Sequence, residues 1–116
     1  MGEIMLSVVV PVYNENNIDL CAERIMSVLE KANILYEIVF VDDGSENGVW
    51  NEINNLTIKN KNIRAVALSR NFGKENAICA GIDVSAGDCV VCIDADMQHP
   101  PEMIPQMYEM WQNGYE

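Results

Sequence analysis

The sequence predicts an α/β fold in which a parallel sheet is covered by helices on both faces. Four apolar segments rich in β-branched residues lack polar–apolar alternation, which is typical of strands buried on both faces. Segments with apolar residues at every third or fourth position separate them. The expected order is therefore β-α-β-α-β-α-β-α. With 116 residues, the chain holds one domain at most.

Each element follows from a local pattern. The expected strands are residues 4–12, 36–41, 63–68 and 89–93. The expected helices are residues 18–32, 48–58, 74–84 and a last one from Pro105 to near Gly114. Asn17 suits the N-cap of the first helix, since its side chain can accept a backbone hydrogen bond. Pro105 suits the first position of the last helix, where a missing N–H costs nothing.

The net charge and the four cysteines argue against several classes of function. The net charge is −11, which argues against nucleic-acid binding and against binding of anionic lipid through basic residues. Cys89 and Cys92 form a CxxC pair, but in a strand they point to opposite faces, so we expect all the cysteines to be buried, free thiols. There is no run of about 18 apolar residues and no secretory signal. Free thiols suit a reducing cytoplasm, where we expect the chain to be located.

Polar residues collect directly after the expected strands. Parallel sheets bind ligands outside the carboxyl ends of their strands, so this placement predicts a site there. The four loops are residues 11–15, 42–45, 70–74 and 94–98.

Asp94 and Asp96 follow the fourth strand as a DxD motif. A bend at the strand end would let both carboxylates reach one cation, and hard oxygen ligands select Mg²⁺ or Mn²⁺. Gln98 can add a carbonyl oxygen or orient a metal-bound water. A turn that merely favours aspartate is the alternative.

The other loops offer contacts for a nucleotide. Asp42 and Asp43 are adjacent, so one can accept hydrogen bonds from a base or ribose while the other caps the turn. Glu15 is either a nucleotide contact or an exposed loop acid. Lys74 opposes the dipole of the helix it begins, which favours a phosphate contact over a solvated side chain. No GxGxxG, no P-loop and no nucleophile–base pair is present.

Four motifs in order then resemble one family. They are VVVPVYNE at residues 8–15, VDDGS at 41–45, SRNFGK at 69–74 and DADMQHPPE at 94–102. Together they resemble family 2 glycosyltransferases of the GT-A fold, and most of all the polyprenyl-phosphate sugar transferases similar to dolichyl-phosphate mannose synthase. The resemblance covers nearly the whole chain.

The resemblance implies an inverting transfer from a UDP- or GDP-sugar to a polyprenyl phosphate or a glycan, in cell-wall or glycan biosynthesis. It implies that the base and ribose are lined by Pro11, Tyr13, Glu15 and Asp42. It implies Mg²⁺ or Mn²⁺ at the diphosphate, held by Asp94, Asp96 and Gln98. A lipid phosphate is already an anionic nucleophile, so no general base is required.

Such catalytic domains are longer than this chain. We therefore expect residues 1–116 to be the N-terminal nucleotide-sugar-binding part of a truncated domain, without the acceptor half and without transfer activity of its own. The full-length protein is expected at the cytoplasmic face of the membrane. The incomplete sheet leaves an exposed edge, which allows self-association.

Two other functions compete. A receiver-like module fits the length and the acidic pair, but that pair follows the second strand and no lysine lies beyond Asp94. A nucleotidyltransferase would have a glycine-rich, basic loop after the first strand, where this chain has Pro11 to Glu15. A fragment that retains no binding is a third interpretation.

Overall fold

The computed structural model describes residues 4–95 and 101–112. Its sheet has four strands, all parallel, in the spatial order β3-β2-β1-β4. The strands are β1 (Met5–Val12), β2 (Leu35–Asp42), β3 (Ile63–Ala67) and β4 (Cys89–Cys92). The helices are α1 (Ile18–Lys31), α2 (Val49–Lys59), α3 (Lys74–Val84) and α4 (Ile104–Gln112), the last preceded by a 3-10 turn, η1 (Pro101–Met103). The predicted parallel α/β fold is confirmed.

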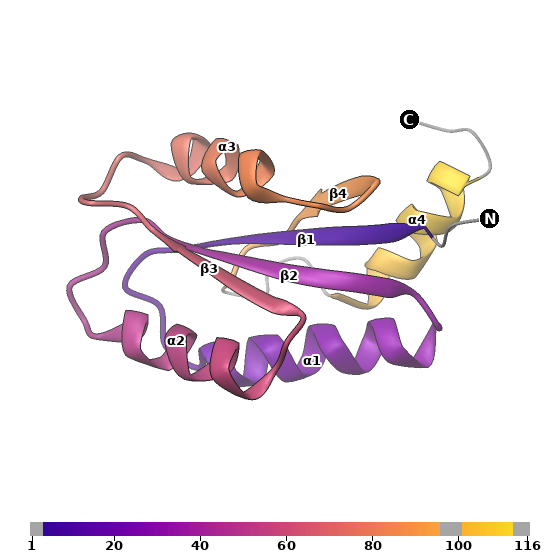
Figure 1. The fold of residues 1–116 in the computed structure, drawn as a ribbon, viewed down its shortest axis with the longest axis horizontal. Coiled ribbons are helices and arrows are strands. Elements are labelled where there is room, and N and C mark those ends of the chain that lie inside the picture. Colours follow the sequence, from indigo (N-terminus) through magenta and orange to yellow (C-terminus); the bar gives the residue numbers. More distant parts are fainter. Residues whose placement is uncertain (1–3, 96–100, 113–116) are drawn as a thin grey trace.

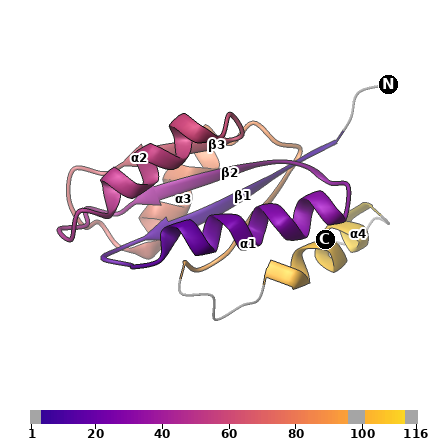
Figure 2. The same cartoon turned by 90° about the horizontal axis from the view of Figure 1, so that it is seen from below.

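Helices cover both faces of the sheet, as predicted. α1 and α2 lie on one face and α3 lies on the other (Figure 1). Seen from below, α1 and α2 lie side by side across the sheet, with α4 beside α1 (Figure 2). The larger part of the core fills the layer between the sheet and α1 and α2. A smaller cluster on the α3 face contains Val9, Val39, Val41 and Ala77.

Gly81 lets α3 approach the sheet closely. A Cβ at this position would lie 2.4 Å from Cγ1 of Val9 and 3.0 Å from Cγ2 of Val41. Real Cβ atoms do not approach other atoms so closely, so the helix would have to move to accommodate a larger residue. The small residues of this helix therefore have a packing role.

Asn17 stands at the N-cap position of α1, but its side chain makes no capping hydrogen bond. Its backbone is left-handed, with φ of 62°, a conformation that asparagine tolerates better than most residues. Its carbonyl accepts a hydrogen bond from the N–H of Cys21 at 3.1 Å. The predicted helix start is right, and the predicted side-chain cap is wrong.

The prediction that all four cysteines are buried is wrong for three of them, since Cys89 is half-buried and two others are exposed. All four are free, but only Cys21 is buried, while Cys79 and Cys92 are exposed. For Cys92 the reason is the place of β4 at the sheet edge, where β1 is its neighbour and α3 packs on β1 and β2 instead. Val91 points into the core shared with α1, so Cys92 points to the uncovered face.

Candidate functional site

The strand order creates a crevice between β1 and β4. The chain leaves β1 through α1 to reach β2 on one side, and reaches β4 on the other side only after α3. The order of the strands therefore reverses between β1 and β4, since β2 and β3 lie on one side of β1 and β4 lies on the other. This is the topological switch point at which open α/β sheets bind ligands.

A pocket of about 360 Å³ lies at this crevice. It is formed by the loops that follow β1, β2 and β4 and by the start of α3. Its lining residues are Pro11, Val12, Tyr13, Glu15, Asp43, Asn71, Gly73, Lys74, Asp94 and Ala95. We call this pocket the switch-point pocket.

The pocket brings together most of the side chains that the sequence singles out. Pro11, Tyr13 and Glu15 come from the end of β1 and the loop after it, Lys74 begins α3, and Asp94 follows β4. Tyr13 is 47% exposed, so its ring is accessible to a ligand. Three of the four predicted loops contribute predicted residues to one cavity.

Two of the three residues expected to hold a metal, Asp96 and Gln98, lie outside the described residues. Asp94 is therefore the described member of that group. Within residues 4–95 and 101–112, no three His, Cys, Asp or Glu side chains form a cluster that could hold a metal ion.

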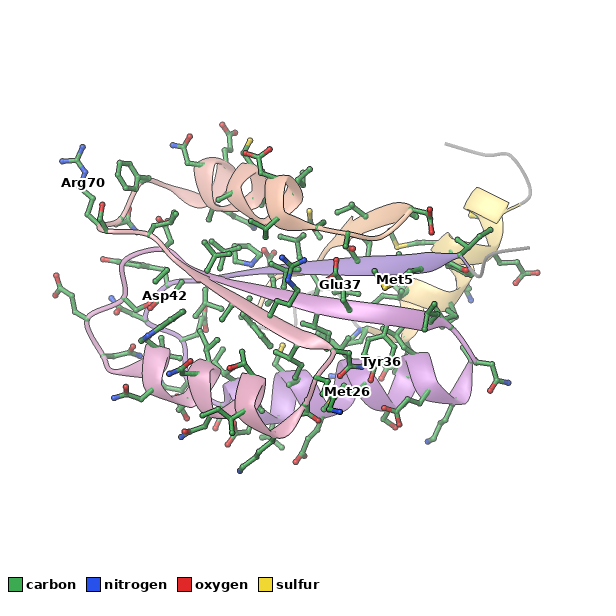
Figure 3. The ribbon with its side chains drawn as sticks, viewed as in Figure 1. Met5, Met26, Tyr36, Glu37, Asp42 and Arg70 are labelled. Atoms are coloured by element: carbon green, nitrogen blue, oxygen red, sulfur yellow. The ribbon has the colours of Figure 1, made fainter. Side chains whose placement is uncertain are left out.

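Asp42 does not line the pocket. Its side chain is buried at the carboxyl end of β2, and its Oδ1 accepts a hydrogen bond from the N–H of Ser45 at 3.0 Å. Asp42 thus caps the turn after β2. Figure 3 shows Asp42 and Arg70 at this end of the sheet, with Met5 and Glu37 toward the opposite end.

Asp43 lines the pocket instead, but its carboxylate already has partners. Its Oδ1 accepts from the N–H of Phe72 at 2.8 Å and its Oδ2 from the N–H of Gly73 at 3.1 Å. Asp43 is 3% exposed. A buried carboxylate with two charge-assisted hydrogen bonds holds this loop rigidly, and Lys74 follows directly.

Gly44 allows the loop before α3 to pass close to the backbone at the end of β2. Its φ is +73°, and a Cβ would lie 2.3 Å from the carbonyl carbon of Arg70. Both the backbone conformation and the close approach require glycine here. Above this crossing, the guanidinium of Arg70 lies over the ring of Phe72, 4.9 Å from its centre.

Asn14 ties the loop after β1 to the loop after β2. Its N–H donates to Oγ of Ser45 at 2.8 Å, and its Oδ1 accepts from the N–H of Glu46 at 2.8 Å. Its φ of 51° turns the chain at this point. These bonds fix the backbone on either side of Asn14, including Tyr13 and Glu15.

Lys74 forms an ion pair with Asp94 across the pocket, from Nζ to Oδ1. The Lys74 side chain is 59% exposed and that of Asp94 is 21% exposed. Asp94 therefore already has a cationic partner in this structure. A carboxylate at a strand end that faces a ligand-sized pocket offers the oxygen ligands that a hard divalent cation prefers, although Lys74 occupies one of them here.

A second, larger groove runs along α1, with a volume of about 1170 Å³. It shares Glu15 and Ala95 with the switch-point pocket. Arg24 and Glu102 cross it with a bidentate ion pair, with N–O distances of 2.7 and 3.0 Å. Apart from Glu15, none of the predicted site residues that the structure describes lines it.

In the part of the chain that the structure describes, no helix is long and apolar enough to cross a membrane.

The parallel sheet and the polar pocket at its switch point define an α/β protein with a candidate ligand site. The chain belongs to Glycosyl transferase family 2, whose family model matches residues 7–116. This membership favours the glycosyltransferase interpretation over the receiver and nucleotidyltransferase alternatives.

The curated relatives are longer proteins. An uncharacterised glycosyltransferase, sll0501, from Synechocystis sp. is 44% identical over 114 residues, which are 97% of this chain and 36% of that protein. The undecaprenyl-phosphate 4-deoxy-4-formamido-L-arabinose transferase of Aeromonas hydrophila is 36% identical over 97% of this chain and 35% of that protein. The chain thus spans about a third of the length of these relatives.

A solved structure confirms the GT-A fold. The mannosyltransferase PcManGT from Pyrobaculum calidifontis, in complex with GDP-Man and Mn²⁺, superposes with a TM-score of 0.68. It is 23% identical, and the match covers 88% of this chain and 30% of that one.

The sequence did not predict the contacts that hold the loops of the pocket together. It did not assign Asp43 to the loop before α3, nor Asn14 to the loop after β2. The pairing of Lys74 with Asp94 was also not foreseen. The glycine of the Asp-Asp-Gly-Ser run was a usable signal, since a glycine beside two aspartates indicates a close backbone crossing as well as a turn.

Proposed function

We propose that this chain binds the nucleoside diphosphate of a sugar donor, and that the protein acts as an inverting glycosyltransferase. The observation that carries the proposal is the switch-point pocket, where Tyr13, Lys74 and Asp94 meet from three different loops. Family membership supports the reaction class. Residues 1–116 would supply the nucleotide-binding part of the catalytic domain.

The lining residues divide by chemistry. Pro11 and the accessible ring of Tyr13 offer apolar surface for the base, since aromatic faces stack on bases. The carboxylate of Glu15 can accept hydrogen bonds from ribose hydroxyls. Asp42 is buried outside the pocket lining, so it would support the nucleotide site by holding the turn after β2.

The diphosphate would lie between Lys74 and the strand end. Asp94 is the described carboxylate there, and Asp96 and Gln98 would complete the oxygen ligands of Mg²⁺ or Mn²⁺. When bound, such a cation would neutralise the diphosphate and stabilise the charge that develops on the leaving nucleotide. The complex of PcManGT with GDP-Man and Mn²⁺ supports this choice of ligand and metal.

We propose a polyprenyl phosphate as the acceptor of the whole protein. The name of the Aeromonas relative supports this class. A lipid phosphate carries its own negative charge, so the acceptor needs no base to activate it. This acceptor would place the full-length protein at the cytoplasmic face of a membrane.

Calorimetric titration of UDP and GDP, with and without Mn²⁺, tests the donor assignment. We expect one nucleotide to bind in a Mn²⁺-dependent manner, and the dependence to be lost in Asp96→Ala. Tyr13→Ala should weaken binding by roughly tenfold, since base stacking contributes about 1–3 kcal/mol. Leu20→Ala, an exposed change on α1, is the control. Binding that ignores Mn²⁺ and Asp96→Ala would contradict the metal assignment, and no binding at all would contradict the site.

A further inference from the structure

Arg70 is a basic residue at the edge of the sheet where the switch-point pocket lies. It belongs to the loop between β3 and α3, which follows the carboxyl end of β3. The other basic residue that follows this strand end, Lys74, pairs with Asp94, and Arg24 and Arg64 pair with glutamates. Among the residues that the structure describes, no carboxylate pairs with Arg70. In a chain with a net charge of −11, an arginine without an acidic partner calls for an explanation.

Arg70 is held against an aromatic side chain. Its guanidinium lies over the ring of Phe72, 4.9 Å from the ring centre, and Phe72 is 43% exposed. An aromatic face attracts a guanidinium and leaves the N–H donors at the rim of that group available. Figure 3 shows Arg70 directed away from the sheet at the edge where the strands end. The donors of Arg70 therefore face the side from which a ligand approaches the pocket.

The backbone of the loop that carries Arg70 is fixed by its neighbours. The N–H of Phe72 donates to Oδ1 of Asp43 at 2.8 Å, and the carbonyl of Phe72 accepts from Nδ2 of Asn76 at 2.6 Å. Arg70 itself passes so close to Gly44 that a Cβ there would meet its carbonyl carbon at 2.3 Å. Because the loop is already ordered, a ligand that meets Arg70 pays little conformational entropy for ordering it.

The charges of the pocket favour an anion as that ligand. Asn71, the neighbour of Arg70 in the chain, lines the pocket. Among the described lining residues there are three carboxylates and one basic residue, Lys74. A phosphate group that approaches the pocket is repelled by this excess of negative charge, and a cation at the mouth offsets the repulsion. A guanidinium also presents paired N–H donors, which match two oxygens of one phosphate.

We propose that Arg70 binds a phosphate group at the mouth of the switch-point pocket, and that Phe72 is the positioning residue that holds its guanidinium there. The inference rests on the proposed function, which supplies two phosphate-bearing ligands. These are the diphosphate of the nucleotide donor and the phosphate of the lipid acceptor. Both have the chemistry that Arg70 recognises, so the experiment has one arm for each source.

Amide NMR titrations at constant ionic strength measure the dissociation constants in both arms, and they also detect weak binding. The first arm compares UDP and GDP with uridine and guanosine. The second arm compares geranyl phosphate with geraniol. In each arm the second ligand lacks the phosphate and is otherwise matched.

We expect Arg70→Gln to weaken binding of a phosphate-bearing ligand about three- to tenfold, between the effect of an exposed ion pair and that of a charge-assisted hydrogen bond. Binding of the matched ligands without phosphate should not change. Arg70→Lys keeps the charge but loses the paired donors, so its loss should be smaller. Lys61→Gln removes the same charge from an exposed position at the opposite edge of the sheet, and it should match the wild type.

A double-mutant cycle tests the role of Phe72. Phe72→Leu keeps an apolar side chain but removes the aromatic face. We expect Arg70→Gln to have a smaller effect in the Phe72→Leu background than in the wild type, because the guanidinium is no longer held in place. Additive effects would show that Phe72 does not position Arg70.

The outcomes separate this inference from the proposed function. A loss confined to the nucleotides assigns Arg70 to the donor, and a loss confined to geranyl phosphate assigns it to the acceptor. If the nucleotides bind and Arg70→Gln weakens neither arm, or weakens uridine or geraniol equally, the inference is wrong and the donor site stands. If geranyl phosphate binding depends on Arg70 and neither nucleotide binds, the inference stands and the donor assignment is wrong. No binding of any of these ligands would overturn both.

Discussion

At the scale of single residues, Glu37 shows how this fold tolerates a buried carboxylate. It lies on β2, toward the end of the sheet opposite the pocket (Figure 3). It accepts hydrogen bonds from Oγ of Ser7 at 2.5 Å, the N–H of Ala86 at 2.6 Å and Nη1 of Arg64 at 3.2 Å. Burial alone would raise the pKa of Glu37, but these three donors outweigh it and hold the pKa below its ordinary value of 4.5.

This shift predicts how stability depends on pH. Between the lowered pKa and the ordinary pKa of Glu37, the folded state binds fewer protons than the unfolded state. The stabilisation is therefore complete above the ordinary pKa and is lost as the pH falls through the lowered one. Urea unfolding from neutral pH to about pH 3 should therefore show a flatter acid decline for Glu37→Gln than for the wild type. Glu37→Gln should also cost about 1–3 kcal/mol at neutral pH, because it disturbs a buried hydrogen-bonded group.

Glu75→Gln, a change in the first turn of α3, is the control for removing one carboxylate. Parallel pH profiles of Glu37→Gln and the wild type would show that the three donors do not stabilise the ionised form.

Asp43 gives a second prediction at this scale. Asp43→Asn replaces one of the two acceptor oxygens with an NH₂ group, so one of the N–H groups of Phe72 and Gly73 loses its partner. We expect a loss of about 1–2 kcal/mol in the free energy of unfolding. We also expect weaker binding of nucleotide, because the loop that carries Lys74 is released. Chemical denaturation and calorimetry measure the two effects. Asp19→Asn, on the exposed side of α1, should change neither quantity.

At the scale of secondary structure, the fit of α3 against β1 depends on one glycine. Gly81→Ala adds a Cβ that meets Val9 at 2.4 Å. Alanine normally stabilises a helix interior by about 1 kcal/mol over glycine, but overpacking costs about 1–3 kcal/mol, so we expect a net loss. In a double-mutant cycle, Val9→Ala should make Gly81→Ala less costly, because it removes the methyl group that clashes. Additive effects of the two changes would contradict this packing account.

The elements themselves were predictable because their signals are local. Period-3.6 apolar spacing located α1, and α3 begins and ends where the sequence indicated. The sequence did not indicate the order of the strands in the sheet. The burial of β4 depends on that order, because β4 lies at the edge. A run such as residues 89–92 looks like a strand covered on both faces, but one face remains open because α3 packs on its neighbours.

At the scale of the whole molecule, the sheet ends at β3 and β4, and each of these strands has one neighbour in the described sheet. An unpaired strand edge favours association, and Val90 on β4 is an exposed apolar side chain there. We expect concentration-dependent self-association in sedimentation experiments, and we expect Val90→Lys to reduce it. Ile58→Lys, at an equally apolar but helical exposed position, should leave it unchanged. Equal behaviour of both variants would place the contact elsewhere.

Much of the candidate site could be predicted from the sequence for a simple reason. Parallel strands bring all their carboxyl ends to one edge, so polar loops after strands must converge there. This geometry placed Tyr13, Lys74 and Asp94 in one pocket. It could not assign the internal hydrogen bonds of Asp42 and Asp43, because those depend on how the loop before α3 crosses β2, a contact between segments far apart in the chain.

The central claim is that the switch-point pocket, and not the larger groove along α1, binds the nucleotide. Backbone amide NMR of the labelled chain during titration with UDP or GDP and Mg²⁺ tests it most directly. We predict the largest shift changes at Tyr13, Gly73 and Lys74, which line only that pocket. Changes confined to Ser27, Val28 and Lys31, which line only the groove, would contradict the account.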